Sequence, residues 1–249
     1  MHTSPPLYPH QIEYFKTHGY LVLKNLLDEA TLDQWRDQIW RELGSDIETP
    51  ETWPRDRGGL DGYEYKPPES NFGLHPAIKS IAEQLGGGDF VLGDGIPIIR
   101  WPDPELEWKK PQSGHIDAYG GRWLPFMFGA TTYLYDVESG GGSFFFWPGS
   151  HLAAHRYLRK HPEQVDGSFL NEEGFSWDVF CDNPTTGAVE FTAAAGDVVL
   201  WHAYLTHEHS VNIHTSPRIA LFTRYDHRLR QEPAFRYEIP TDLWKRWAI

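Results

Sequence analysis

The stretch that decides the fold runs from residue 196 to residue 221 and reads GDVVLWHAYLTHEHSVNIHTSPRIAL. It opens with a turn and a buried strand at residues 198–201, passes through a polar stretch, and enters a second apolar strand at Arg218. Histidine is the commonest side-chain ligand for transition metals, so His202, His207 and His209 are all candidate ligands. A guanidinium at the start of a buried strand needs an anionic partner. Arg218 therefore predicts either an internal salt bridge or a bound carboxylate.

Short strands separated by turns also occupy most of the chain after residue 88. Seven apolar or aromatic runs are punctuated by Gly and Pro, at residues 90–92, 96–101, 126–135, 143–147, 188–191, 198–201 and 218–225. Several strands of this length indicate a sandwich, a barrel or a jelly roll. Residues 151–187 form a polar insertion that the pattern does not assign.

The residues before 88 have a helical pattern instead. A first helix is predicted over residues 9–18 and ends at Gly19, and a strand follows at residues 20–23. A second helix is capped by Asp28 and ends at Gly44, and a third covers residues 76–85. We therefore predict one domain over residues 1–249, mainly β with flanking helices. Residues 1–88 would form a helical layer and lid, and residues 89–249 a jelly-roll core.

Residues 45–73 are rich in Pro, Gly and charge and lie between the second and third helices. A structureless stretch of this length is normally either disordered or functional. Its aromatic side chains exceed what a linker needs, so we predict a lid over a site; they are Trp53, Tyr63, Tyr65 and Phe72. We expect this segment and residues 101–112 to wall the substrate pocket.

The composition excludes several classes of protein. Lys plus Arg total 22 against 35 Asp plus Glu, and the resulting net charge of −13 would repel nucleic acid and anionic membranes. Aromatic residues make up 15% of the chain, far too many for a disordered protein. The single cysteine, Cys181, cannot form an internal disulfide, and no stretch has the apolar length of a membrane span. We expect a globular, cytoplasmic monomer or homodimer that acts on a small molecule.

A second candidate site lies in the segment SGHIDAY, residues 113–119. Side chains alternate in an extended chain, so His115 and Asp117 point to the same face. An imidazole nitrogen and a carboxylate oxygen then converge on one point. His161 and Glu163 share this spacing, but they fall in a polar stretch without a strand pattern, so we set that pair aside.

Two histidines and one carboxylate, with open positions opposite them, form the facial triad of non-haem Fe(II) oxygenases. The same ligands would also suit a zinc-dependent hydrolase, or could be vestigial in a non-catalytic jelly-roll binding module. A dicarboxylate co-substrate would require a nearby arginine, and Arg218 meets that requirement. Metal-assisted hydrolysis gives no reason for this arginine.

Four stretches resemble the phytanoyl-CoA dioxygenase family of Fe(II)- and 2-oxoglutarate-dependent oxygenases, which have a double-stranded β-helix (jelly roll) core. They are residues 10–36, the segment 115–117, residues 136–151 with their Pro-Gly-Ser-His sequence, and the block 196–221. Together they span nearly the whole chain. Within the last block, only His207 has Asn212 and Arg218 at the family's spacing.

The resemblance implies a metal centre and a co-substrate site. Fe(II) would be bound by His115, Asp117 and His207. The distal carboxylate of 2-oxoglutarate would pair with Arg218, and three further residues would contact the co-substrate: Thr132, Tyr133 and His209.

The resemblance also implies the reaction. We expect the chain to hydroxylate an unidentified small molecule with consumption of O₂ and release of succinate and CO₂. Halogenating relatives replace the carboxylate ligand with a small residue, so Asp117 disfavours halogenation. His151 and His202 are expected to be structural.

Overall fold

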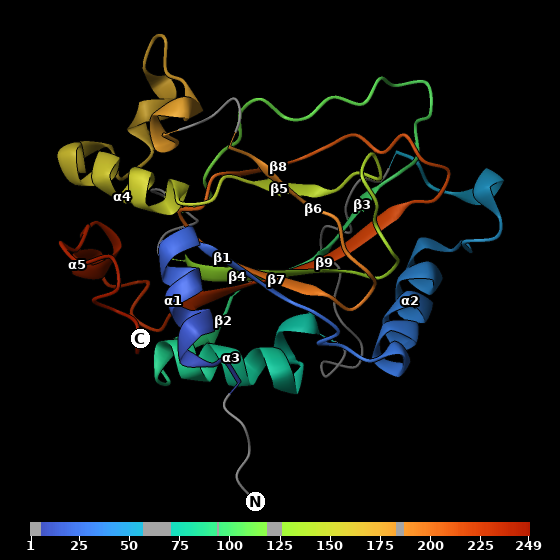
Figure 1. Cartoon of the computed structure of the whole chain (residues 1–249), viewed down its shortest axis with the longest axis horizontal. Helices are drawn as coiled ribbons and strands as arrows, with labels where there is room; N and C mark the ends of the chain where they lie inside the picture. The colour runs from blue at the N-terminus through green and yellow to red at the C-terminus, as the bar shows by residue number, and fades with distance from the viewer. Residues whose placement is uncertain (1–5, 57–70, 94, 119–125, 183–186) are drawn as a thin grey trace, which may run out of the picture.

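Two antiparallel sheets form the centre of the computed structural model, which describes residues 6–56, 71–93, 95–118, 126–182 and 187–249. In the larger sheet the strand order is β1 (Tyr20–Leu23), β7 (Val198–His202), β4 (Phe126–Tyr133), β9 (Arg218–His227) and β2 (Phe90–Leu92), and β3 (Pro97–Arg100) also pairs with β9. The smaller sheet has the order β6 (Val189–Phe191), β5 (Phe144–Phe146) and β8 (His207–His209). Figure 1 shows the smaller sheet above the larger one.

The two faces of the larger sheet have different partners because side chains alternate along each strand. Residues such as Val198, Leu200 and Leu221 pack into a core cluster with the helices. Their neighbours on the opposite face, including Val199 and Ala220, pack in a second cluster with residues of the smaller sheet. The space between the sheets is the one that receives the functional side chains.

Three helices supply the layer on the outer face of the larger sheet: α1 (Pro9–His18), α2 (Glu29–Leu43) and α3 (Pro76–Gly86). The backbone N–H of Thr31 donates to the Asp28 carboxylate at 2.8 Å, which caps the start of α2. At the end of α1, Gly19 has a φ of 78°, a conformation that other residues adopt only at a cost. Figure 1 shows α3 below the larger sheet, on the side away from the smaller one.

The unassigned insertion contains α4 (Ser150–Lys160) and three short 3₁₀ helices, η4 (Pro162–Gln164), η5 (Ser168–Asn171) and η6 (Trp177–Phe180). Their apolar side chains form a small core of their own around Ile116, with Leu158, Phe169 and Phe180 fully buried. Among the described residues before α3 there are two further 3₁₀ helices, η1 (Pro50–Thr52) and η3 (Phe72–Leu74), and α5 (Pro233–Arg236) follows β9. The insertion therefore packs against Ile116, the residue between His115 and Asp117.

The elements confirm most of the predicted helices and strands. The helix at residues 9–18 has its predicted ends, and each of the predicted β segments contains a strand. The prediction missed α4 and β8. Part of the predicted lid, residues 57–70 with Tyr63 and Tyr65, lies outside the described residues. Trp53 and Phe72, from its two ends, are buried in the core cluster between the larger sheet and the helices. Its role as a lid stays a prediction, as does the organisation into one domain.

No helix in the described part of the chain combines the length and apolar character needed to cross a membrane.

Candidate active site

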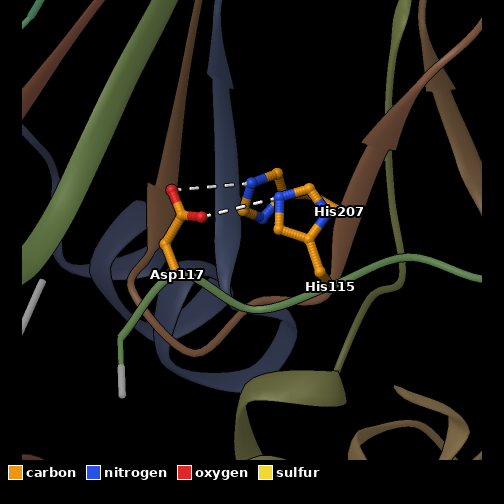
Figure 2. A group of neighbouring side chains, drawn as sticks. All are labelled: His115, Asp117 and His207. Carbon is orange, nitrogen blue, oxygen red and sulfur yellow. Dashed lines mark ion pairs between the residues drawn. The ribbon is translucent and has the colours of Figure 1, made fainter. Parts of the chain in front are cut away.

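His115 and His207 are brought together by the backbone. Each donates its N–H to the carbonyl of the other, at 3.0 and 2.9 Å, in an isolated antiparallel bridge. The imidazole rings consequently lie with their centroids 4.5 Å apart. Asp117 follows two residues after His115 and turns its carboxylate toward both rings, as Figure 2 shows.

The three side chains offer a compact set of ligand atoms. His115 Nε2 lies 3.5 Å from Asp117 Oδ1, and His207 Nε2 lies 3.8 Å from Asp117 Oδ2. One ligand atom from each residue lies within 4.8 Å of the others, a spacing that leaves room for a metal ion between them. Two nitrogens and one carboxylate oxygen on one side of an ion are the donor set of the facial triad, so these residues fit iron(II).

Neighbouring groups orient both imidazoles. His207 Nδ1 lies 2.9 Å from the Leu205 carbonyl, so this nitrogen carries the proton and Nε2 presents its lone pair to the metal position. His115 Nδ1 lies 3.6 Å from Oε2 of Glu208. A carboxylate behind a ligating histidine makes the imidazole a stronger ligand and fixes its orientation.

The charges around the three ligands also suit metal binding. Burial lowers the pKa of His207 to about 4, which keeps this imidazole neutral at physiological pH. Burial alone would raise the pKa of Asp117, but His207, Arg224 and His115 together lower it below its usual range. The carboxylate is therefore ionised when a cation arrives. Burial also opposes protonation of His115, but Glu208 and Asp117 raise its pKa. His115 therefore carries a proton more often than His207 does, and a metal ion would have to displace that proton.

A cavity of about 170 Å³ extends from the three ligands to Arg218. Its walls also include Phe144, Trp201 and Phe222, which give it an apolar lining. The Arg218 guanidinium donates to the carbonyls of Gly142 at 2.8 Å and Ile98 at 3.4 Å. No carboxylate of the described residues lies within ion-pairing distance of it. Burial lowers the pKa of Arg218 to about 10, so the group remains a buried cation at neutral pH.

The three residues predicted to contact the co-substrate, Thr132, Tyr133 and His209, lie in different surroundings. His209 lines the cavity, and its ring contacts the guanidinium of Arg100. Tyr133 lies beside Arg218, with the guanidinium 5.9 Å from the centre of its ring. Its hydroxyl donates to the Phe191 carbonyl and accepts from the Phe144 N–H.

Thr132 is not brought to the cavity. Its hydroxyl donates to the Asp197 carbonyl at 2.8 Å, on the face of β4 that packs toward the helices. Thr131, one residue earlier, lines the cavity instead. The alternation of side chains along β4 puts the two threonines on opposite faces, so a prediction one residue out of register selects the wrong face.

The remaining candidate histidines lie away from the metal position. His202 is buried and accepts the Tyr204 N–H at Nδ1, and its ring stacks on Trp247. His151 lies on α4 with Nε2 3.0 Å from the Lys16 carbonyl. Of the three histidines that the pattern left open as the distal ligand, the structure brings only His207 to His115 and Asp117.

Sequence reasoning missed two charged residues at this site. Arg224 Nη2 lies 2.6 Å from Asp117 Oδ2, and Glu208 stands behind His115. Both could have been suspected from position, because Glu208 adjoins His207 and Arg224 shares a strand face with Arg218.

A second cavity, of about 650 Å³, lies beside the first. It is lined by Arg55, by residues 99–106 and by Val211 and Asn212. Arg100 belongs to its wall and contacts His209, which lines the metal cavity, so the walls of the two cavities meet at this pair. The sequence predicts that residues 45–73 and 101–112 wall the substrate pocket. Arg55 belongs to the first of these segments and residues 101–106 to the second.

Comparisons with known proteins agree with this geometry. The family model for phytanoyl-CoA dioxygenase matches residues 15–220. The structure is similar to a non-haem α-ketoglutarate-dependent carbocyclase, SnoK from nogalamycin biosynthesis, at 21% identity over 90% of this chain and 87% of that one, with a TM-score of 0.59. It also resembles HygX from Streptomyces hygroscopicus with nickel and 2-oxoglutarate bound, at 19% identity over 89% and 87% of the two chains, TM-score 0.56.

A third similar structure is EctD from S. alaskensis with 2-oxoglutarate and 5-hydroxyectoine, at 15% identity over 94% of this chain and 85% of that one, TM-score 0.62. No curated protein shows a significant match to the chain. These similarities confirm the predicted double-stranded β-helix fold, and the family match together with the convergent triad confirms iron and 2-oxoglutarate as the cofactors.

Proposed function

The chain belongs to the phytanoyl-CoA dioxygenase family, and from this premise we propose that it hydroxylates a small molecule in a reaction that consumes 2-oxoglutarate and O₂ and releases succinate and CO₂. One observation carries the proposal. A cluster of two histidines and one aspartate and a buried arginine line the same cavity, and no carboxylate of the described residues is paired with that arginine.

The roles of the metal ligands follow from their chemistry. His115, Asp117 and His207 would hold iron(II) on one side and leave the side facing the cavity open. When bound there with 2-oxoglutarate, iron supplies the oxidising power for attack on a C–H bond. Glu208 and the Leu205 carbonyl keep both imidazoles turned toward the metal position.

Arg218 would bind the distal carboxylate of 2-oxoglutarate. A buried guanidinium without an anion is costly, and a ligand carboxylate would relieve this cost. The two carbonyl acceptors hold the guanidinium in place while leaving other N–H groups for a bidentate pair. The volume of about 170 Å³ suits a small diacid better than it suits a diacid and a substrate together.

The apolar wall of the cavity would protect the reaction from water. Phe144, Trp201 and Phe222 surround the space between the metal ligands and Arg218. A dry site strengthens electrostatic interactions and limits side reactions of an oxidising centre. Residues of this chain thus supply orientation and exclusion of solvent.

The adjoining cavity of about 650 Å³ is our candidate for part of the substrate site. Its wall offers the guanidinium of Arg55 and the indole of Trp101, so it suits a molecule with both polar and ring-bearing parts. Solved relatives of this fold include a carbocyclase, an epimerase and a structure with hygromycin B bound, so the fold leaves the reaction open. The carboxylate ligand Asp117 disfavours halogenation, and hydroxylation is the reaction that we propose among those that remain.

Formation of succinate from 2-oxoglutarate tests the proposal. The purified chain, loaded anaerobically with Fe(II), is mixed with 2-oxoglutarate, O₂ and a library of small molecules. We expect at least one compound to stimulate succinate formation in the parent chain and not in Asp117→Ala. A zinc hydrolase would turn over without 2-oxoglutarate, and a binding module would form no substrate-dependent succinate, so either result would contradict the proposal.

A further inference from the structure

We propose that Arg224 is a positioning residue of the metal centre. Its guanidinium binds Oδ2 of Asp117 and thereby reserves Oδ1 for the metal. This inference rests on the proposed function, because it concerns the same metal site.

The ion pair between Arg224 and Asp117 is short and shielded from solvent. Nη2 lies 2.6 Å from Oδ2, and the two side chains are only 12% and 16% exposed. Charge-assisted hydrogen bonds of this length are among the strong ones in proteins. Oδ1, the oxygen that Arg224 does not bind, lies 3.5 Å from His115 Nε2, and Oδ2 lies 3.8 Å from His207 Nε2.

Occupation of one oxygen decides how the carboxylate can bind a metal. A free aspartate is able to chelate an ion with both oxygens, and the second oxygen then fills a position that a facial triad leaves open. With Oδ2 held by Arg224, Asp117 would bind a metal through Oδ1. The side of the metal that faces the cavity would then stay open to 2-oxoglutarate and O₂.

The guanidinium is held in place independently of Asp117. It lies 4.7 Å from the centre of the Phe222 ring and 6.0 Å from that of Trp201. Trp201 in turn donates its indole N–H to Thr131 Oγ1 at 3.0 Å. Aromatic faces attract a guanidinium, so these rings present Arg224 to the aspartate in a fixed orientation.

Gly129 makes this arrangement possible. In the larger sheet it lies between the two residues, opposite Trp201 on β7 and opposite Arg224 on β9. A Cβ atom at this position would overlap the indole ring of Trp201. The absence of a side chain lets the indole lie across β4 and reach the guanidinium.

The strand β9 therefore carries two cations on the face that lines the cavity, six residues apart. Arg224 is paired with the carboxylate of a metal ligand. Arg218 is paired with no carboxylate among the described residues and is the candidate for the co-substrate. The difference in partners assigns them different tasks.

Affinity for Mn(II) alone tests the proposal without turnover. The electron paramagnetic resonance signal of free Mn(II) is followed during titration of the parent chain, Arg224→Gln, Arg224→Lys and a control, Arg36→Gln. Arg36 is comparably buried but pairs with Glu29 and Asp33 on α2. Loss of a residue that orients a metal ligand typically weakens binding about 10–100-fold, which is the expectation for Arg224→Gln. Arg224→Lys should lie between it and the parent, because lysine keeps the charge and loses the forked geometry.

The Asp117→Ala background separates positioning from general damage. There Arg224 has no carboxylate to hold and only repels the ion, so Arg224→Gln should leave the residual Mn(II) affinity unchanged or raise it. Affinities of both Arg224 variants within about twofold of the parent would overturn the inference, and so would an equal loss in both backgrounds. Failure of the parent chain to bind Mn(II) would instead contradict the proposed function.

Discussion

His115 and His207 exchange both of their backbone hydrogen bonds, although 92 positions separate them in the chain. This bridge places the two imidazoles side by side without the help of a metal ion. Short-range geometry then adds Asp117, which is two residues from one histidine, and Glu208, which adjoins the other. Backbone pairing thus brings the two histidines of the metal position together.

Arg218→Ala should weaken binding of 2-oxoglutarate to the metal-loaded chain. Removal of one partner of a buried ion pair typically costs about 2–5 kcal/mol, so the dissociation constant should rise at least about 30-fold. Anaerobic calorimetric titration with 2-oxoglutarate measures it. Arg228→Ala is the control, because Arg228 forms an exposed ion pair with Asp89 on the surface. An unchanged affinity in Arg218→Ala would remove this arginine from the co-substrate site.

Gly129→Ala should destabilise the fold. The added methyl group would overlap the indole of Trp201, and overpacking of a well-filled core costs about 1–3 kcal/mol. Denaturant unfolding gives the change in free energy. In a Trp201→Phe background the smaller ring should relieve the overlap, so the same glycine substitution should cost less there. Equal costs in the two backgrounds would show that the indole is not what the glycine accommodates.

Buried His151 should make the fold less stable in mild acid. Burial lowers its pKa from 6.5 to about 4. The unfolded chain takes up a proton as the pH falls below 6.5, while the folded chain does so only near pH 4. Stability is therefore lost as the pH falls through this window, by about 1 kcal/mol per pH unit from this one group.

His151→Gln isolates this effect, because the amide can still donate to the Lys16 carbonyl but does not titrate. Denaturant unfolding at pH 7.5 and pH 5.5 should give a smaller loss of stability in the variant than in the parent chain. The same loss in both proteins would mean that His151 is not the group responsible.

The metal ligands and Arg218 could be predicted from the sequence because their spacing is local or matches a family pattern. His115 and Asp117 need only an extended chain to share a face, and Arg218 begins an apolar strand whose buried end requires an anion. The helix at residues 9–18 was equally readable, since its glycine stop lies in the adjacent position.

What the sequence did not reveal depends on distant contacts. The strand β8 is His-Glu-His, which has no β pattern, and it becomes a strand by pairing with β5. The ion pair of Arg224 and Asp117 joins positions 107 residues apart. The resemblance points to Thr132 on β4, whereas Thr131 lines the cavity, because a family resemblance locates a strand more securely than it fixes which residues face the cavity.

The central claim is that His115, Asp117 and His207 bind one iron beside a 2-oxoglutarate held by Arg218. The most direct measurement is the visible absorption spectrum of the anaerobic chain during addition of Fe(II) and then 2-oxoglutarate. We predict a weak metal-to-ligand charge-transfer band that appears only when both are present and is absent from the His207→Ala and Asp117→Ala variants. No band in the parent chain, or a band of full intensity in either variant, would contradict the account.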